Sequence, residues 1–220
     1  MKHLIVIGGG FAGVRAAQAA AAEARAAGAS LVITLVSETD RLTLRPRLYK
    51  AEPETWELPL RPALEPLGIN LLVGRATQVD TVCRQVAVDR RRHPPSTIGY
   101  DVAVIAAGSR LQPPAVPGLN DNVLDVDTAA GARRLLKHLS RLQIGPGCST
   151  FVILGAGFTG LELATELRGT LAQLHGPGFA EAARILLVDP NPAAPELGER
   201  PRRTLEHAMA AARIETRFGR

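Results

Sequence analysis

The sequence predicts an α/β protein that contains the same parallel-sheet unit twice, with the second copy truncated. Two observations support this prediction. Four apolar residues run into a glycine-rich turn and a helix-forming stretch within residues 4–27, and the same order returns from residue 151. In each copy a further apolar run follows and leads to an acidic residue. A strand, a tight turn, a helix and a second strand in this order are typical of a βαβ unit.

The first glycine-rich turn has the GxGxxG spacing and directly follows the apolar run that starts at Leu4. Such glycines allow a tight turn, let a pyrophosphate approach the backbone and let the helix pack closely on the strand, while the helix N-terminus adds N–H donors. The residues predicted to bind the cofactor here are Gly8, Gly10, Phe11, Ala12 and Gly13. Glu38 follows the second strand, where an acid would bind a ribose hydroxyl. This copy is therefore predicted to be a Rossmann-like, three-layer dinucleotide-binding domain.

Several further elements are expected in the first copy. Prolines at positions 46, 53, 59, 62 and 66 exclude one long helix, so short helical turns and loops are expected there. The other expected elements are a helix from Phe11 to Ala27, strands at Leu31–Ser37 and Leu71–Ala76, an antiparallel excursion at Gln78–Asp89 and a buried strand at Tyr100–Gly108.

The second copy is another Rossmann-like unit, and a helix between Asp127 and Leu142, with Thr128 as N-cap, is expected before it. The residues predicted to bind its nucleotide are Gly155, Gly157, Phe158, Thr159 and Gly160. Asp189 ends the following strand, and its carboxylate would bind a ribose 2′-hydroxyl and repel a 2′-phosphate, which favours NAD over NADP. The last expected elements are a helix at Arg202–Ala212 and a strand at Arg213–Phe218.

Composition and charge argue against several other classes of protein. The net charge is +5, but the arginine clusters are scattered and lack interleaved aromatic residues, so nucleic-acid binding is not expected. Cys83 and Cys148 form no CxxC motif and are interpreted as buried small side chains. The five histidines share no metal-ligand spacing, so no metal site is expected. With no apolar run long enough for a membrane span and no room for a signal peptide before the first strand, a cytoplasmic location is expected.

These motifs together resemble the FAD-dependent pyridine nucleotide-disulfide oxidoreductases, because Tyr100–Ser109 and Val116–Gly118 lie between the two glycine-rich turns as in that family. The resemblance implies that residues 1–117 are the N-terminal part of an FAD-binding domain and that residues 118–220 are an incomplete NAD(H)-binding domain. It also implies that Glu38 holds the adenosine ribose of FAD. The remaining cofactor-binding residues predicted on this basis are Arg45, Ala76, Ala107 and Gly108.

The scarcity of cysteines makes the chain similar to the cysteine-free branch of the family, in which electrons pass directly from the flavin to an outside acceptor. The opening glycines and the alanine-rich helix resemble type II NADH dehydrogenases, so a quinone or another small electron acceptor is the expected partner. Arg45–Lys50 is similar to a segment of oxygenase-coupled ferredoxin reductases, so an NADH-dependent ferredoxin or rubredoxin reductase is an alternative. A non-enzymatic, truncated nucleotide-binding remnant is a third.

The resemblance also implies a catalytic pair. Family members pass a hydride from NADH to the flavin, and Lys50 would lie beside the flavin in an ion pair with Glu162. Glu166, one helical turn later, is expected to face solvent. The chain matches only the N-terminal portion of family members, which continue with a return to the first domain and a C-terminal domain. A peripheral contact with the inner face of the cell membrane is therefore expected only through that C-terminal part.

Overall fold

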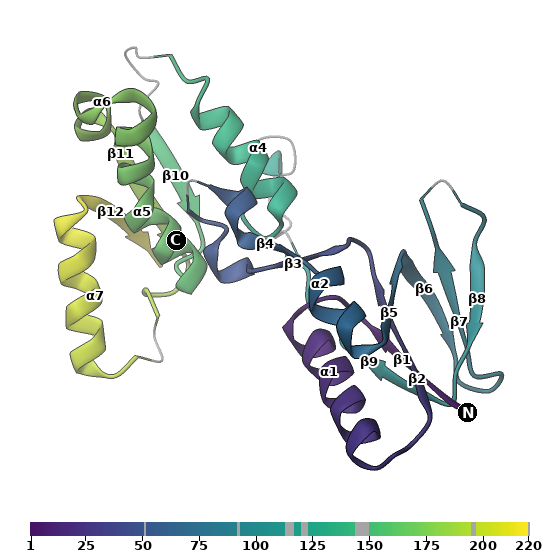
Figure 1. Cartoon of the computed structure of the whole chain (residues 1–220). Coiled ribbons are helices and arrows are strands. Elements are labelled where there is room, and N and C mark those ends of the chain that lie inside the picture. Colours follow the sequence, from purple (N-terminus) through teal and green to yellow (C-terminus); the bar gives the residue numbers. More distant parts are fainter. Residues whose placement is uncertain are drawn as a thin grey trace. The chain divides into compact units, whose positions relative to one another are not determined.

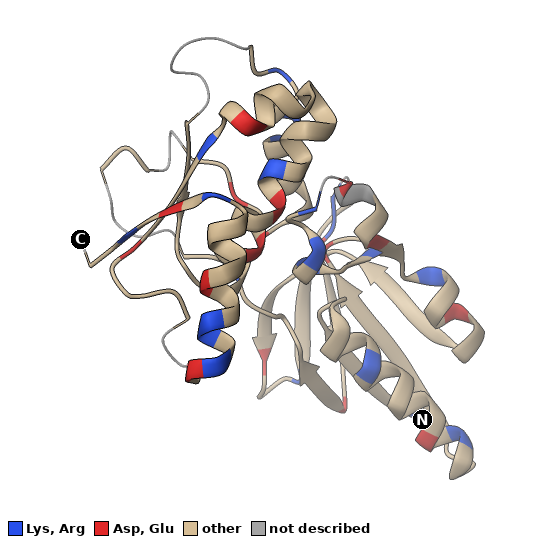
Figure 2. Ribbon diagram, turned by 90° about the vertical axis from the view of Figure 1, so that its left-hand side faces the viewer, with Lys and Arg blue, Asp and Glu red and all other residues tan. Residues whose placement is uncertain are grey.

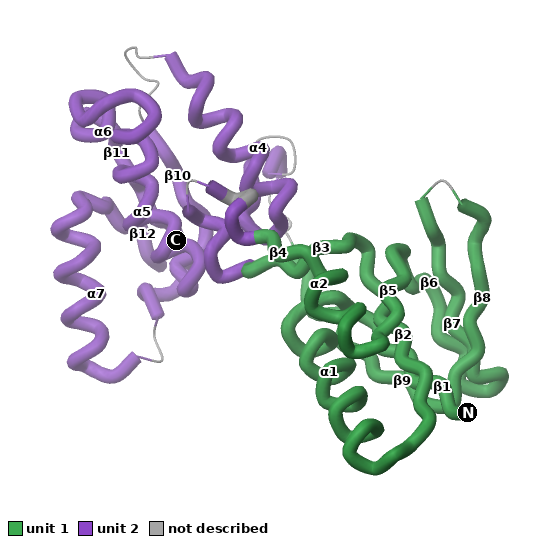
Figure 3. Tube along the Cα trace, viewed as in Figure 1, with its two compact units in different colours: residues 1–44, 57–112 green, residues 45–56, 113–220 purple. Residues whose placement is uncertain are grey.

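The computed structural model describes residues 1–50, 52–91, 93–112, 117–119, 123–143, 150–194 and 197–219 (Figure 1). Contacts divide the chain into two compact units (Figure 3). Unit 1 contains residues 1–44 and 57–112, and unit 2 contains residues 45–56 and 113–220. The sequence-based boundary followed residue 117, whereas this division follows residue 112 and assigns residues 45–56 to unit 2.

Unit 1 is built on a parallel sheet with the strand order β5-β2-β1-β9. The elements around this sheet are β1 (Lys2–Ile7), α1 (Phe11–Ala26), β2 (Leu31–Ser37), α2 (Arg61–Leu64), η3 (Glu65–Leu67), β5 (Ile69–Val73) and β9 (Val102–Ile105). Two smaller antiparallel sheets consist of β3 (Arg41–Thr43) with β4 (Glu57–Pro59), and of β6 (Arg75–Asp80), β7 (Gln85–Asp89) and β8 (Ser96–Gly99). The expected parallel strands and antiparallel excursion are therefore present, but the strand expected at Leu71–Ala76 is parallel only as far as Val73, and Arg75 and Ala76 already belong to the antiparallel strand β6.

The central strand β1 faces two cores because successive side chains of a strand point to opposite faces. Leu4 and Val6 pack with α1, whereas Ile5 and Ile7 pack with Val86 and other residues of the β6-β7-β8 sheet. The parallel sheet is thus covered by a helix on one face and by an antiparallel sheet on the other (Figure 1). Unit 1 has the three layers that the sequence predicted.

The last strand of this sheet differs from its expectation. The apolar run that contains β9 predicted a buried strand, but Val102 and Ile105 are 53% and 69% exposed. Strand β9 pairs only with β1 and so forms an edge of the sheet among the described residues. The proline-rich region forms short elements as expected, and its 3-10 turns η1 (Arg45–Arg47) and η2 (Pro53–Trp56) belong to unit 2.

Unit 2 repeats the parallel arrangement, with the strand order β10-β11-β12. Its elements are α4 (Ala129–Leu139), β10 (Thr150–Leu154), α5 (Phe158–His175), α6 (Pro177–Ala182), β11 (Arg184–Asp189), α7 (Glu199–Ala211) and β12 (Ile214–Phe218). The Thr128 hydroxyl accepts a hydrogen bond from Gly131 N at 3.0 Å, which confirms the predicted N-cap of α4. One core joins Ile153, Leu187 and the helices.

Arg168 on α5 connects the ends of two other helices of unit 2. Its Nε donates to Ala212 O at 2.9 Å and its Nη2 to Arg213 O at 3.3 Å, at the C-terminal end of α7. Its Nη1 donates to Ala180 O and to Ala183 O, at the C-terminal end of α6. Helix ends leave carbonyl groups without intrahelical partners, and this guanidinium satisfies four such groups at once. We infer that Arg168 fixes α6 and α7 against α5.

Replacing Arg168 is expected to destabilise unit 2. Arg168→Met would lower the free energy of unfolding by about 2–3 kcal/mol, because hydrogen bonds from a charged group are lost and carbonyls are left without donors. Arg168→Lys would recover only part of the lost free energy of unfolding, since an ammonium cannot span both helix ends. The measurement is urea unfolding followed by fluorescence of the single tryptophan, Trp56, which lies in unit 2.

Arg203→Met is the matched control, because Arg203 pairs with Glu199 one turn away on the same helix and is 76% exposed. Such an exposed pair contributes about 0.5 kcal/mol or less. Equal losses in Arg168→Met and Arg203→Met would contradict the role given to Arg168.

Candidate functional site

The first glycine-rich loop contains two glycines that the fold itself requires. Gly8 has φ +120°, and a Cβ placed there would lie 2.1 Å from Ala106 O. A Cβ at Gly13 would lie 1.9 Å from Gly8 O, because the first turn of α1 packs against the end of β1. A Cβ at Gly10, in contrast, would meet no atom within 4 Å. The space above Gly10 is open and fits the close approach of a pyrophosphate.

The second loop repeats this geometry. Gly155 has φ +101°, and a Cβ at Gly160 would lie 1.9 Å from Gly155 O. A Cβ at Gly157 would meet no atom within 4 Å, as at Gly10. Phe158 and Thr159 follow in the first turn of α5, and Phe158 is 66% exposed. Each unit therefore presents an open glycine and the N-terminus of a long helix at the end of its first strand.

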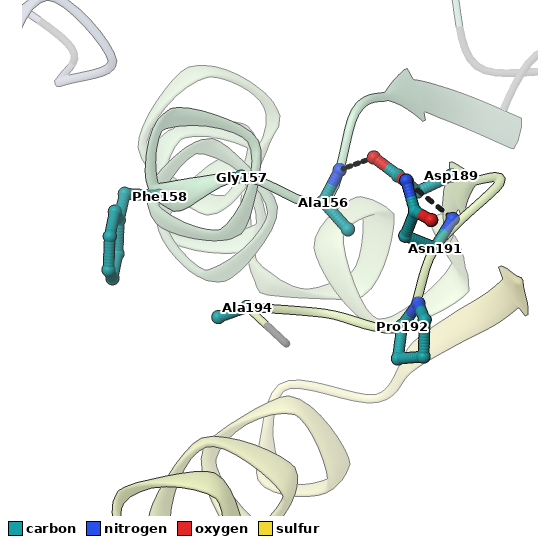
Figure 4. A pocket seen from close by; sticks show the side chains of 7 residues that line it. All are labelled: Ala156, Gly157, Phe158, Asp189, Asn191, Pro192 and Ala194. Carbon is teal, nitrogen blue, oxygen red and sulfur yellow. Dashed lines mark hydrogen bonds between the residues drawn. The ribbon is translucent and has the colours of Figure 1, made fainter. Parts of the chain in front are cut away.

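Asp189 closes one side of a cavity of about 180 Å³ next to the second loop (Figure 4). Its carboxylate accepts hydrogen bonds from Ala156 N and Asn191 N, both at 2.7 Å. The bond from Ala156 and then that from Asn191 lower the pKa of the Asp189 carboxyl below its usual value, so the group is negative at neutral pH. The opposite wall contains Gly157 and Phe158. A ribose hydroxyl donor suits this carboxylate better than a phosphate does.

The two acids that the sequence assigned to the same role occupy different positions. Gly8 N donates to Val36 O and Gly155 N donates to Val188 O, both at 2.8 Å, so Val36 and Val188 are equivalent. The next residue is Asp189 in unit 2 but Ser37 in unit 1. Ser37 is 7% exposed and packs on the loop, since a Cβ at Gly9 would lie 2.2 Å from its Oγ. Glu38 therefore lies one residue beyond the position of Asp189.

Glu38 is bound by two arginines that the sequence analysis did not identify. Nη2 of Arg110 lies 2.8 and 2.9 Å from the two carboxylate oxygens of Glu38, and Nε of Arg75 lies 3.7 Å from one of them. Arg75 begins β6, and Arg110 follows the turn at Gly108, whose φ is +72°. No spacing rule connects residues 38, 75 and 110, so this cluster became visible only in the folded chain.

The remaining residues assigned to the first cofactor lie at different places in unit 1. Ala107 and Gly108 follow β9 beside the first loop, where Ala106 O approaches Gly8. Ala76 instead packs against the core between the parallel sheet and the β6-β7-β8 sheet. Its side chain thus contributes to the core, and its assignment to a cofactor remains a prediction.

Residues 45–50 lie in unit 2, and their ion pairs differ from those expected. Lys50 Nζ lies 3.9 Å from Glu166 Oε1, so its ion pair is with Glu166 and not with the expected Glu162. Glu166 was expected to face solvent, and its side chain is 48% exposed. Arg45, assigned to the cofactor, forms an ion pair with Asp127. The first pair joins this segment to α5, and the second joins it to the residues just before α4.

Tyr49 was not singled out by the sequence analysis, yet it lies among these charged groups. Burial, and then the nearby Glu162 carboxylate, raise the pKa of the Tyr49 phenol. The guanidinium of Arg47 acts in the opposite direction and also lies 5.7 Å from the centre of the Trp56 ring. Glu162 is therefore close enough to influence this segment, although it does not form the ion pair with Lys50.

The described residues also test the expectations about charge, metal binding, membrane spans and cysteines. Lysines, arginines and acids are distributed over helices and strands of both units (Figure 2). The described residues contain no group of three metal-ligating side chains and no helix long and apolar enough to cross a membrane.

Cys83 is exposed in the turn between β6 and β7, so its interpretation as a buried side chain was wrong. Cys148 and Val116 lie outside the described residues.

Comparison with known families matches residues 2–220 to the pyridine nucleotide-disulphide oxidoreductase family. An NADH dehydrogenase-like protein of Mycobacterium tuberculosis is 35% identical over 226 residues, which cover 100% of this chain and 56% of the relative. Demethylphylloquinone reductase NdbB of Synechocystis is 28% identical over 193 residues, covering 85% of this chain and 46% of the relative. The chain thus spans about half the length of these curated relatives.

A solved structure shows the same fold. The structure of NDH2 from Plasmodium falciparum in complex with NADH has a TM-score of 0.83 at 14% identity, and it covers 99% of this chain and 48% of that chain. The arrangement of strands and helices is therefore that of a known fold.

The hydrogen bonds to Asp189 predict a pH-dependent contribution to stability. Asp189→Asn would lower the free energy of unfolding of unit 2 by about 1 kcal/mol at pH 7, because two backbone N–H donors lose a charged acceptor. The folded-state pKa is depressed, so this stabilisation is present above the unfolded pKa of about 4 and is lost as the pH falls through the folded value. The difference between the two proteins should therefore narrow between pH 7 and pH 3 in urea unfolding monitored by Trp56 fluorescence.

Glu206→Gln, at an exposed position of α7, is the control and should change stability by about 0.5 kcal/mol or less at both pH values. A destabilisation by Asp189→Asn that is the same at pH 7 and pH 3 would refute the electrostatic explanation.

Proposed function

Because this chain belongs to the pyridine nucleotide-disulphide oxidoreductase family, we propose that it forms the FAD- and NADH-binding part of an oxidoreductase that reduces a quinone. The observation that carries the proposal is the repeated loop in which Gly10 and Gly157 leave open space at a helix N-terminus. The fold does not need a glycine at either position, so a ligand that approaches the backbone explains both. Two such loops suit two dinucleotides.

We assign FAD to unit 1, which contains most of residues 1–117, and NADH to unit 2, which contains most of residues 118–220. The carboxylate of Asp189 supports NADH over NADPH, because it is held negative beside the second loop and would repel a 2′-phosphate. In unit 1 the pair of arginines at Glu38 adds positive charge near the site proposed for the FAD pyrophosphate.

The reaction is a hydride transfer from NADH to the flavin followed by electron transfer to an acceptor, chemistry that the cofactors supply when bound. The chain's own contribution is to bind and orient them. Lys50 and Glu162 remain the proposed catalytic residues, with Lys50 supplying positive charge near the reacting ring. Glu166 holds the Lys50 ammonium at 3.9 Å and is therefore added as a positioning residue.

A quinone is the proposed acceptor because the Synechocystis relative is named for reducing one and this chain lacks a CxxC motif. Quinones with long apolar tails partition into membranes, so we propose a cytoplasmic protein that meets the inner face of the membrane. Since the chain spans about half of its relatives, we assign this contact to the part of the relatives that it does not cover.

Flavin binding tests the proposal directly. After incubation with FAD and gel filtration, the 220-residue protein should retain the visible absorption bands of the flavin, and NADH should bleach them more rapidly than NADPH. A quinone should then restore the bands, whereas restoration only by a ferredoxin or rubredoxin would favour the alternative acceptor. A colourless native protein would contradict the proposal and favour a nucleotide-binding remnant.

Gly10→Ala is the matched variant, because its Cβ would meet no protein atom and the φ of Gly10 is an ordinary −82°. It should unfold at the same urea concentration as the native protein but elute without flavin. Gly157→Ala should keep the flavin and lose bleaching by NADH. Retention of both properties in these variants would show that the ligands do not approach these glycines.

The role of Lys50 is testable by the rate of that bleaching. Lys50→Met should retain FAD and slow flavin reduction by NADH about tenfold to a hundredfold in stopped-flow absorbance, because a charge near the reacting ring is lost. Lys2→Met, in the exposed first residue of β1, should leave the rate unchanged. An unchanged rate in Lys50→Met would remove Lys50 from the catalytic residues.

A further inference from the structure

We propose that Arg110 is a positioning residue for the nucleotide of unit 1, where it holds the Glu38 carboxylate in place beside the first glycine loop and offsets its charge. The inference rests on the proposed function, in which unit 1 binds FAD. Neither the family match nor the GxGxxG pattern assigns a role to Arg110.

The topology of the parallel sheet brings Glu38 and Arg110 to the same edge. Strands β2 and β9 lie on either side of β1, which ends in the glycine loop. Glu38 directly follows β2, and Arg110 follows β9 after the left-handed turn at Gly108. Their ion pair therefore joins the two chain segments that flank the end of β1. Parallel sheets bind their ligands at this edge.

Contacts of the loop show that both segments enclose it. A Cβ at Gly8 would meet Ala106 O at 2.1 Å, and a Cβ at Gly9 would meet Ser37 Oγ at 2.2 Å. Ala106 precedes Arg110 by four positions and Ser37 precedes Glu38 by one. The loop is thus held between the two segments, and the pair of Arg110 with Glu38 connects them.

The charges at this edge favour an anionic ligand. One carboxylate is surrounded by two guanidinium groups, Arg110 at 2.8 Å and Arg75 at 3.7 Å. Without them, the negative charge of Glu38 would repel the two negative charges of a pyrophosphate. With them, the cluster carries a net charge of +1, and the carboxylate can still accept hydrogen bonds from a ribose. Arg110 therefore makes an acidic ribose ligand compatible with the phosphates beside it.

In unit 2 the corresponding acid is held in place without an arginine. There the carboxylate of Asp189 is fixed by the backbone N–H groups of Ala156 and Asn191. In unit 1 the acid lies one residue later, at the position that Pro190 occupies in unit 2, and Ser37 takes the place next to the loop. The structure gives Glu38 hydrogen bonds from Arg110 instead. Arg110 therefore holds the carboxylate of Glu38 in place, as two backbone N–H groups hold that of Asp189.

The ion pair between Arg110 and Glu38 is exposed, so the binding of a ligand can be tested without disturbing the fold. The side chains of Arg110 and Glu38 are 70% and 52% exposed, and exposed ion pairs contribute little to stability. Removing Arg110 is therefore expected to weaken nucleotide binding and to leave the fold intact.

The test compares native protein, Arg110→Met and Arg110→Lys in binding to FAD, measured by quenching of flavin fluorescence. Arg110→Met should raise the Kd for FAD at least tenfold, and Arg110→Lys should recover part of the loss. Competition of FAD with ADP and with 2′-deoxy-ADP gives the second readout, the preference of the site for ADP over 2′-deoxy-ADP. Native protein should prefer ADP, and Arg110→Met should lose most of that preference because Glu38 no longer faces the ribose.

Two controls make the result specific. Arg91→Met removes an exposed arginine from the turn between β7 and β8 and should change neither the Kd nor the preference for ADP. In the Glu38→Gln protein, the further change Arg110→Met should add little, since the two residues act as one unit. Urea unfolding should be the same for native protein and Arg110→Met.

Each other outcome overturns the inference in a distinguishable way. An unchanged Kd in Arg110→Met would show that the pair has no role in binding. A raised Kd with an unchanged preference for ADP would show that Arg110 contacts the phosphates and does not act through Glu38. Native protein that binds neither FAD nor ADP would refute the proposed function of unit 1 together with the inference.

Discussion

The close contact between the first turn of a helix and the end of a strand is the constraint on which each unit depends. At Gly13 and Gly160 the backbone passes so near the carbonyl of the first glycine of the loop, Gly8 or Gly155, that a Cβ would lie 1.9 Å from it. This contact places the N-terminus of α1 or α5 directly over the strand end. Gly10 and Gly157 then remain open at the same place, where helix N–H groups have no intrahelical partner. One packing requirement therefore creates the open space that we propose as the ligand site.

The two units use this shared geometry with different electrostatics. Asp189 is fixed by backbone N–H groups, which lower its pKa and keep it charged. Glu38 is held by the side chains of Arg110 and Arg75 and lies one residue further along the chain. Backbone donors are built into the loop, whereas arginines bring charge from distant parts of the sequence. The two copies of one motif therefore fix their acids by different means.

The contacts of the segment 45–56 could not be predicted from its motif alone. Its resemblance to a flavin-contacting segment led to the expectation of a pair between Lys50 and Glu162. In the folded chain this segment packs with unit 2, and Lys50 is paired with Glu166, one turn later on α5. Both carboxylates are on the first half of the same helix, and the sequence offered no means of choosing between them. The path of residues 45–50 decides which one Lys50 reaches.

The sequence by itself determined the α/β class, the two glycine-rich turns, the parallel strands and most helix limits, because these follow from local hydrophobic periodicity and from glycine and proline chemistry. It also predicted the N-cap Thr128 and the position of Asp189 at the end of the strand after the second loop, because their partners are near in sequence or set by the motif. Only the tertiary structure decided the offset between Glu38 and Asp189, the contacts of Arg110 and Arg168, and the exposure of β9. Those features depend on strand register and on contacts between distant residues, for which a single sequence carries no local signal.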